Sequence, residues 1–343
     1  MVEVELSRIN EALTVKHPYL GALIVIVGLL KLGSIFRSLF AVIRSTLLVR
    51  GNRLSPYRLK GGKPTWAVVT GPTAGIGEQF AHQIAAAKFN VALVGRNQEK
   101  LDTVAKELES KYNVETASFI LDAATATEEE YQSLAKFVAD LGSVTVLVNN
   151  LGISHDMPVP FNKMDDEEMR RIVQVNCVAT IEITKAVLPT IENTAGPKSN
   201  KGLILTMGSF AGLTPAPLLS VYSGSKMFLQ GWSSALGAEL KASNIDVQLI
   251  ISYLVTSKLS KVRKTSLLIP SPKGFVKSVL RQLGRNGGAQ ERAFTMTPYW
   301  SHALMHWVIE STLGVYSGIV SKINLGMHAD IRKRALRKKN KAN

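Results

Sequence analysis

Short apolar runs rich in β-branched residues alternate with longer amphipathic stretches over residues 65–251. Strands that alternate with helices at this spacing favour a parallel, doubly wound sheet with right-handed crossovers. We therefore predict an α/β fold with helices on both faces of the sheet. The expected strands lie at 66–70, 91–94, 117–121, 144–148, 203–207 and 247–251, and the expected helices at 76–88, 98–110, 127–141, 165–190 and 222–241.

The N-terminal part has a different pattern. Residues 19–30 are apolar and uncharged, and the apolar character continues past Lys31 and Arg37 to residue 41. Because long basic side chains near the end of a tilted helix can reach the membrane surface, we predict one transmembrane anchor at 19–41. A cleaved signal peptide is the alternative, although no small-residue cleavage pattern is evident and Lys31 interrupts the exit side of the run.

Charge then indicates the partners and the orientation. The formal net charge of +15 requires an anionic partner, but zinc-finger spacing, RNA-binding aromatic patterns and basic zippers are absent from the sequence, so we expect no nucleic acid. The basic residues instead fill the last dozen positions and follow the anchor without any acid, which by the positive-inside rule places the rest of the chain in the cytosol. From the end of the apolar run onward they are Arg37, Arg44, Arg50, Arg53, Arg58, Lys60 and Lys63. Membrane lipid and a phosphorylated cofactor explain this distribution better than nucleic acid does.

A glycine-rich turn follows the first strand and opens a helix at residues 71–77. Glycines allow a tight turn and a close approach to a pyrophosphate, whose charge is favourable at a helix N-terminus. An ordinary turn is the alternative, but the strand-turn-helix context favours a dinucleotide site. At the end of the second strand, where NAD enzymes carry an acid, this chain has Arg96. A guanidinium suits a 2′-phosphate, which favours NADPH, unless Arg96 is only a solvated residue at the start of a helix.

Four further residues form a candidate catalytic group: Asn176, Ser209, Tyr222 and Lys226. Tyr222 and Lys226 are four residues apart, so they share one face of a helix. We expect Lys226 to lower the pKa of Tyr222 and to hold the nicotinamide ribose. Ser209 is expected to bind the substrate carbonyl oxygen, and Asn176 to hold a water that relays protons.

These motifs together resemble the short-chain dehydrogenase/reductase family over about residues 65–260. The glycine motif is Thr70 to Gly77, the adenine-site acid is Asp122, and the motif after the fourth strand is Asn149-Asn150-Leu151-Gly152, in which Leu151 replaces the usual alanine. The resemblance implies a Rossmann-like sheet and the Asn-Ser-Tyr-Lys tetrad. It also implies cofactor contacts at Gly71, Thr73, Gly75, Ile76, Gly77, Asp122, Asn150, Tyr222 and Lys226.

Within that family the chain resembles the membrane-bound very-long-chain 3-oxoacyl-CoA reductases of fatty acid elongation, particularly the fungal ones, over residues 203–213, 222–236, 251–261 and 296–303. This resemblance implies NADPH-dependent reduction of a very-long-chain 3-oxoacyl-CoA at the endoplasmic reticulum membrane, beside other elongation enzymes. The family's Pro-Gly after strand six is absent, but the subgroup shares that departure, so nicotinamide contacts are still expected at Val255, Thr256 and Ser257. The alternatives are a steroid or retinoid oxidoreductase and a cofactor-binding scaffold in an elongase complex.

The C-terminal part is less regular. We predict a helix from about 272 and an amphipathic or membrane-contacting helix at 301–320, where Glu310 disfavours a second span. His302 and His306 have metal-ligand spacing but no third ligand nearby in sequence, so we expect interfacial helix residues and no metal.

A basic cluster is expected to bind coenzyme A phosphates or lipid headgroups, and the tail resembles a dilysine retrieval signal at Lys339 and Lys341. The cluster comprises Lys258, Lys261, Arg263 and Lys264.

The expected organisation follows from these features. It has an N-terminal segment, a transmembrane anchor, a basic linker, an NADPH-binding catalytic domain, a helical extension with a substrate loop, and a basic tail. Their limits are 1–18, 19–41, 42–64, 65–260, 261–330 and 331–343.

Overall fold

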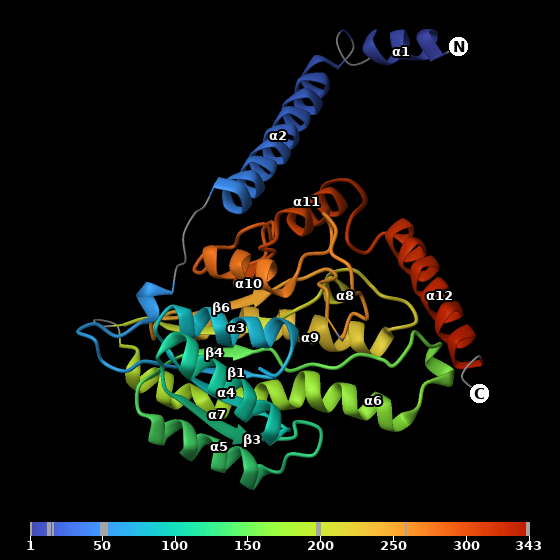
Figure 1. Cartoon of the computed structure of the whole chain (residues 1–343). Helices are drawn as coiled ribbons and strands as arrows, with labels where there is room; N and C mark the ends of the chain where they lie inside the picture. The colour runs from blue at the N-terminus through green and yellow to red at the C-terminus, as the bar shows by residue number, and fades with distance from the viewer. Residues whose placement is uncertain are drawn as a thin grey trace.

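The computed structural model describes residues 2–11, 15, 17–48, 54–196, 200–257 and 259–340. Within them the chain forms a parallel seven-stranded sheet in the order β3-β2-β1-β4-β5-β6-β7 (Figure 1). The order reverses between β1 and β4, and in such sheets the ligand binds in the crevice at the carboxyl ends of the strands. The strands are β1 (Trp66–Thr70), β2 (Asn90–Gly95), β3 (Thr116–Ile120), β4 (Val144–Asn149), β5 (Gly202–Met207), β6 (Ile245–Ile250) and β7 (Thr295–Met296).

Helices cover both faces of this sheet, which is why its central strands are almost entirely apolar. One face packs against α3 (Gly75–Ala86), α4 (Gln98–Tyr112) and α10 (Pro272–Arg281), and the other against α5 (Glu128–Leu141), α7 (Ala179–Thr194) and α9 (Ser220–Leu240). Alternate strand residues face the two layers, as Val69 and Val68 do in β1. The predicted doubly wound α/β fold is therefore confirmed, and β7 is a strand that the sequence pattern did not reveal.

The helix predicted at 165–190 is not continuous. It consists of α6 (Asp166–Val173), a π-helical turn η5 (Gln174–Val178) and α7. Asp165 caps the start, because its side chain accepts a hydrogen bond from the backbone N–H of Glu168. A π-turn adds one residue without changing the apolar pattern enough to be noticed, and such turns are frequent at functional sites. The prediction of one regular helix was wrong at this turn.

The predicted N-terminal anchor corresponds to a long helix, α2 (Pro18–Ile43), that continues as the π-turn η2 (Arg44–Leu48). It is apolar and long enough to cross a membrane, its most apolar window has no buried residue, and it projects from the rest of the chain after the short helix α1 (Val2–Glu11) (Figure 1). The second stretch that passes the same test, residues 166–194, is largely buried in the core. The start of the predicted linker is thus helical, while Arg50 and Arg53 of that linker lie outside the described residues.

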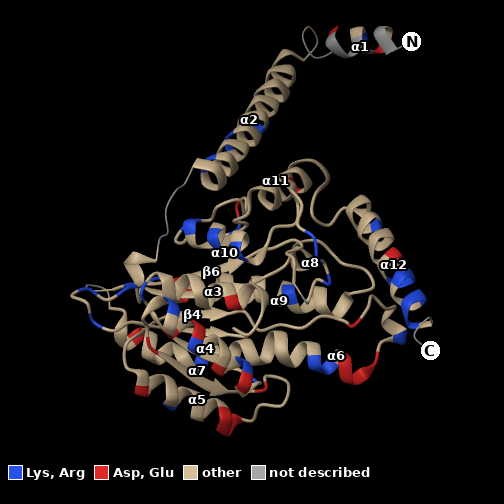
Figure 2. Cartoon of the chain, in the orientation of Figure 1, with Lys and Arg blue, Asp and Glu red and all other residues tan. Residues whose placement is uncertain are grey.

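The C-terminal part also differs from the prediction. The apolar stretch 301–320 is not one helix: α11 (Trp300–Val308) and the π-turn η6 (Ile309–Leu313) end at Gly314, whose positive φ of 80° breaks the helix before α12 (Gly318–Asn340). The basic tail forms the last turns of α12 (Figure 2), but Lys341 of the dilysine-like signal and Lys258 of the basic cluster lie outside the described residues.

The two histidines of α11 are buried, so the prediction that they are interfacial was wrong. His302 accepts a hydrogen bond from the backbone N–H of Tyr253, and its other ring nitrogen lies 3.0 Å from the carbonyl oxygen of Leu268. His306 contacts Thr297 and Glu310. Each histidine therefore joins α11 to loops of the domain, through contacts that a helical periodicity does not reveal.

Candidate active site

The glycine turn connects β1 to α3 at the carboxyl edge of the sheet. Gly71 and Gly75 have φ values of +62° and +63°, a region that favours glycine. A Cβ atom on Gly77 would lie 2.1 Å from the carbonyl oxygen of Gly71, so only glycine allows the first turn of α3 to pack this closely. The helix therefore begins directly against the backbone of the turn.

Asn150 holds this turn to the end of β4. Its side-chain amide donates hydrogen bonds to the carbonyl oxygens of Thr70 and Gly71, at 3.0 Å and 3.1 Å. The Thr70 hydroxyl oxygen in turn accepts from the backbone N–H groups of Asn150 and Leu151. These bonds join the two strands at the point where the strand order reverses. Asn150, predicted as a cofactor contact, thus has a structural role in shaping the turn.

The turn has the features of a dinucleotide site. Ala74 precedes α3 without a side-chain cap, so N–H groups at the start of the helix are available to an anion. Gly75 lies next to Ser257, because a Cβ on Gly75 would be 3.6 Å from the Cβ of Ser257. The loop of Val255, Thr256 and Ser257, which follows β6, is therefore brought beside the glycine turn. These residues fit the pyrophosphate and nicotinamide parts of a dinucleotide.

The other predicted cofactor residues also follow strands. Thr73 and Ile76 lie partly exposed within the turn. Asp122 comes just after β3, and its carboxylate accepts a 3.0 Å hydrogen bond from the backbone N–H of Ala124. Arg96 is exposed just after β2, and in the described part of the chain its guanidinium forms no ion pair or hydrogen bond. An anion near the end of β2 would find this guanidinium available.

Asn176 is fully buried in the π-turn η5. Its side-chain oxygen accepts from the backbone N–H of Ile153, and its amide donates to the Ile153 carbonyl oxygen and to the Ser225 hydroxyl, all within 2.9 Å. The chain after β4 is thereby fixed to α9. A Cβ atom on Gly152 would lie 3.4 Å from both the Asn176 side-chain oxygen and the Lys226 ammonium, so the three residues converge.

Ser209, Tyr222 and Lys226 meet between β5 and α9. Ser209 caps α8 (Phe210–Leu213), since its hydroxyl accepts from the backbone N–H of Ala211, and it also forms a side-chain hydrogen bond with Tyr222. The Lys226 ammonium is buried, donates a 2.8 Å hydrogen bond to the Met207 carbonyl oxygen and lies 6.0 Å from the centre of the Tyr222 ring. The structure therefore brings together three residues that lie up to 17 positions apart.

The pKa values of this pair differ from expectation. Burial raises the pKa of Tyr222, and the opposing effect comes from the hydrogen bond with Ser209, not from Lys226. Burial also lowers the pKa of Lys226 itself to about 8. The expectation that Lys226 lowers the Tyr222 pKa is thus not met here, because burial dominates and the ammonium is directed to a backbone carbonyl. A tyrosine with a raised pKa remains a proton donor at neutral pH.

His155 follows the Asn149–Gly152 motif, a position for which the sequence left open a residue at the mouth of the active site or a solvated loop residue, and the structure buries it. Its Nε2 accepts a 3.4 Å hydrogen bond from the backbone N–H of Tyr222, in the first turn of α9, where Leu219 provides no side-chain cap. Its Nδ1 lies 3.7 Å from a carboxylate oxygen of Glu168, and burial lowers the pKa of His155. A neutral imidazole with its proton on Nδ1 can accept at Nε2, while Nδ1 has no hydrogen-bond partner among the described residues. The only sequence signal was its position just after the Asn149–Gly152 motif.

The chain is similar to known proteins in sequence and in fold. The family model described as short chain dehydrogenase matches residues 65–267. The very-long-chain 3-oxoacyl-CoA reductase of Scheffersomyces stipitis is 49% identical over 325 residues, covering 94% of this chain and 92% of its own. That of Candida albicans is 49% identical over 337 residues, covering 97% and 95%.

Among solved structures, a short-chain dehydrogenase from Sphingobium yanoikuyae in complex with NADPH matches with a TM-score of 0.57 at 22% identity, covering 69% of this chain and 88% of its own. At this identity the likeness concerns the fold alone. The matched family region contains the glycine turn, the Ser209, Tyr222 and Lys226 group and strands β1 to β6. The chain belongs to the short-chain dehydrogenase family and is an oxidoreductase that uses a nicotinamide cofactor.

Proposed function

We propose that this protein reduces a very-long-chain 3-oxoacyl-CoA to the 3-hydroxyacyl-CoA with NADPH, the first reduction of the fatty acid elongation cycle. The observation that carries the proposal is the meeting of Ser209, Tyr222 and Lys226 beside the glycine turn, in a chain 49% identical to relatives with that activity in their name. An apolar helix long enough to span a membrane fits a substrate whose acyl chain is held in lipid.

The residues have complementary tasks in this reaction. When bound, the reduced nicotinamide cofactor supplies a hydride to the carbonyl carbon. Ser209 and Tyr222 hydrogen-bond the carbonyl oxygen, and the Tyr222 hydroxyl donates the proton that this oxygen needs as it gains charge. Because burial raises the pKa of Tyr222, the hydroxyl is protonated at neutral pH and acts as the acid. The Ser209 hydrogen bond favours the phenolate that remains after transfer.

Lys226 and Asn176 serve the proton supply. With a pKa of about 8, Lys226 is mostly charged at neutral pH and can return a proton toward Tyr222 while it holds the nicotinamide ribose. Both amide hydrogens of Asn176 are used by Ile153 and Ser225. One lone pair on its side-chain oxygen remains for the proposed relay water, because Ile153 uses the other.

The preference for NADPH over NADH rests on Arg96, whose guanidinium is exposed at the end of β2 where NAD enzymes carry an acid. A charge-assisted pair with the 2′-phosphate is available only with NADPH. Replacing Arg96→Gln is expected to raise the KM for NADPH at least tenfold and to leave the KM for NADH unchanged. An equal rise in the KM for NADPH and for NADH would mean that Arg96 contributes to binding of both cofactors and does not recognise the 2′-phosphate.

We also propose that the protein resides in the endoplasmic reticulum membrane with its catalytic domain in the cytosol, near other elongation enzymes. The apolar helix, the basic residues that follow it and the basic end of α12 support this arrangement (Figure 2). Protease protection of epitope tags placed at the two ends in sealed microsomes tests the orientation. The N-terminal tag is expected to be protected and the C-terminal tag to be cleaved.

The central test uses the full-length protein purified in detergent. NADPH consumption is measured with a long-chain 3-oxoacyl-CoA and with an oxosteroid, for the wild type, Tyr222→Phe and the control Tyr112→Phe, which lies on α4. Loss of the acid is expected to reduce turnover about 10²–10⁴-fold, and the control to retain it. Activity on the oxosteroid alone would refute the assignment of a 3-oxoacyl-CoA substrate and favour a steroid oxidoreductase. Full activity of Tyr222→Phe would refute the role of Tyr222 as the proton donor.

A further inference from the structure

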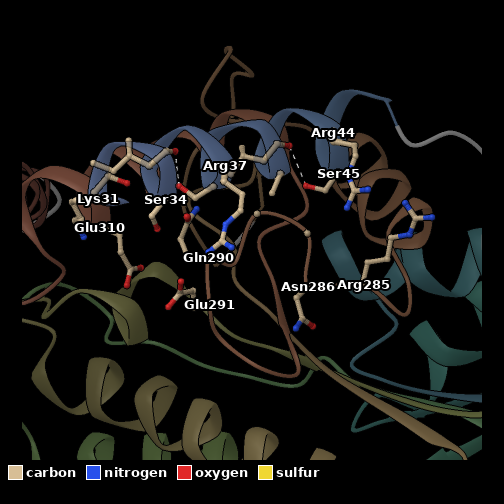
Figure 3. A pocket seen from close by; sticks show the side chains of 17 residues that line it. Lys31, Ser34, Arg37, Arg44, Ser45, Arg285, Asn286, Gln290, Glu291 and Glu310 are labelled. Carbon is tan, nitrogen blue, oxygen red and sulfur yellow. Dashed lines mark hydrogen bonds between the residues drawn. The ribbon is translucent and has the colours of Figure 1, made fainter. Parts of the chain in front are cut away.

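A hollow of about 840 Å³ lies between α2 and the loop of residues 285–291, away from the active site (Figure 3). The loop is tied to the middle of β6 by Gln248, whose side-chain amide donates to the Arg285 carbonyl oxygen and whose side-chain oxygen accepts from the backbone N–H of Gly284. Gly284 also approaches Asp246, near the start of β6. The active site is at the carboxyl ends of the strands, so the hollow is a separate feature.

Cationic side chains enter this hollow from both sides. Lys31, Arg37 and Arg44 come from α2 and η2, and Arg285 comes from the loop. Figure 3 shows the Arg44 and Arg285 side chains extending towards each other from opposite walls. Over the described ranges of the chain, none of the four has an ion-pair partner. Like charges that converge in this way are favourable when an anion lies between them.

The acids at the hollow do not neutralise these cations. Of the two that line it, Glu310 is already paired with Arg292 and with His306, which hold its pKa at about 2. Glu291 alone remains against four cations. Gln290 adds a hydrogen-bond donor, because its side-chain nitrogen is buried without a partner in the described part of the protein. The hollow is therefore positively charged, and it contains a hydrogen-bond donor that is available to a ligand.

The position along α2 indicates where the hollow lies relative to a bilayer. At about 1.5 Å per residue, the helix from Pro18 to Arg37 is about 29 Å long, close to the ~30 Å of a hydrocarbon core. The residues of α2 and η2 that line the hollow run from Lys31 to Ser45, at the end of that length. Trp307 of α11 holds this end to the domain, since its indole N–H donates a 2.9 Å hydrogen bond to Ser38. The hollow thus faces the headgroup layer.

We propose that this hollow binds the phosphate of an anionic phospholipid headgroup, with the guanidinium groups of Arg37, Arg44 and Arg285 as its ligands. Planar guanidinium groups form paired hydrogen bonds with phosphate oxygens, and basic hollows beside transmembrane helices at the cytosolic surface are suited to such headgroups. The lipid bridges α2 to the 285–291 loop and fixes the catalytic domain against the membrane. The inference rests on the membrane anchorage proposed above.

The test uses the full-length protein in detergent with added lipid. The thermal midpoint is measured with dioleoyl phosphatidylserine, with dioleoyl phosphatidylcholine and with inorganic phosphate. The variant is Arg44→Gln/Arg285→Gln, and the control Lys106→Gln/Lys136→Gln makes the same charge change on exposed positions of α4 and α5. Phosphatidylserine is expected to stabilise the wild type and the control, with at least tenfold weaker binding to the variant and no effect of phosphatidylcholine.

Other outcomes overturn the proposal. An equal response of variant and control means that the hollow is not the site, and full stabilisation by inorganic phosphate means that it binds free anions. Carbonate extraction of membranes and NADPH-dependent turnover are measured on the same proteins. Release of the wild-type protein by carbonate refutes the membrane anchorage and the lipid site together. If the wild-type protein stays in the membrane and binds lipid but shows no NADPH-dependent turnover, only the proposed reaction is refuted.

Discussion

Replacing Lys226→Met is expected to make the protein more stable and inactive at the same time. The Lys226 residue is 5% exposed, and its ammonium donates one hydrogen bond, to the Met207 carbonyl oxygen. Burial lowers its pKa from 10.5 to about 8, so the folded state holds the charge less well than the unfolded state does. A methionine of similar length fills the same space without a charge.

The magnitude follows from this shift. A change of ~2.5 pKa units at about 1.36 kcal/mol each corresponds to about 3 kcal/mol of cost for the buried charge. The variant loses the hydrogen bond to Met207 and leaves that carbonyl unpaired, which costs about 1 kcal/mol. The net expectation is a gain of about 2 kcal/mol in the free energy of unfolding at pH 7.

The pH dependence gives the sharper test. Below pH 8 the lysine is protonated in both states, so the cost is present in full. As pH rises from about 8 to 10.5 the folded state loses its proton first, the unfolded state binds more protons, and wild-type stability increases. The advantage of the methionine variant should therefore shrink over this window and reverse above it, where only the lost hydrogen bond, about 1 kcal/mol, remains. Thermal unfolding in detergent at pH 7 and pH 10 measures the difference.

The control is Lys106→Met, an exposed lysine on α4, for which no stabilisation is expected at either pH. NADPH turnover of Lys226→Met should fall at least about 10²-fold, because the ribose contact and the proton supply are both lost. If Lys226→Met is no more stable than the wild type at pH 7, or if its advantage is the same at pH 10, burial of the charge is not what lowers the Lys226 pKa.

Two further predictions concern the site. Gly77→Ala places a methyl group 2.1 Å from the Gly71 carbonyl oxygen, so the turn must shift. NADPH binding, measured by fluorescence titration, should weaken at least tenfold. The control Gly33→Ala on α2, where an added methyl group meets no atom within 4 Å, should leave NADPH binding unchanged. Unaltered NADPH affinity would separate the turn from the cofactor. His155→Ala removes the acceptor for the Tyr222 N–H, so steady-state kinetics should show kcat lowered about fivefold with an unchanged KM for NADPH, which corresponds to the roughly 1 kcal/mol typical of a helix cap. A lower affinity for NADPH with normal kcat would contradict a role in placing Tyr222.

Much of this architecture follows from local pattern. Six of the seven strands, the apolar N-terminal helix and the glycine turn occur within a few residues of where apolar runs and turn residues predict them. Such features depend on local backbone preferences and on the burial of one face of a helix or strand, and both can be recognised from residues that are close in the sequence. The sequence did not predict the short strand β7, because two residues are too few to show a strand pattern. This strand forms only through its pairing with β6 in the folded sheet.

Other features depend on contacts between distant segments. The burial of His302 and His306 results from packing of α11 against other segments, and His302 contacts Tyr253 and Leu268, which are remote in sequence. His155 meets Tyr222 across 67 positions, which no motif at either residue encodes. These are properties of the folded surroundings rather than of residue spacing.

By itself, the sequence determined the chemistry that is present: a glycine turn after a strand, a Tyr-Lys pair on one helix face, and an apolar helix followed by basic residues. Only the tertiary structure decided how that chemistry behaves. Burial raises the pKa of Tyr222 and lowers that of Lys226, against the effect expected from two neighbours on a helix. The reason is that spacing along a chain fixes which groups are close, whereas their solvation is set by every segment that packs around them.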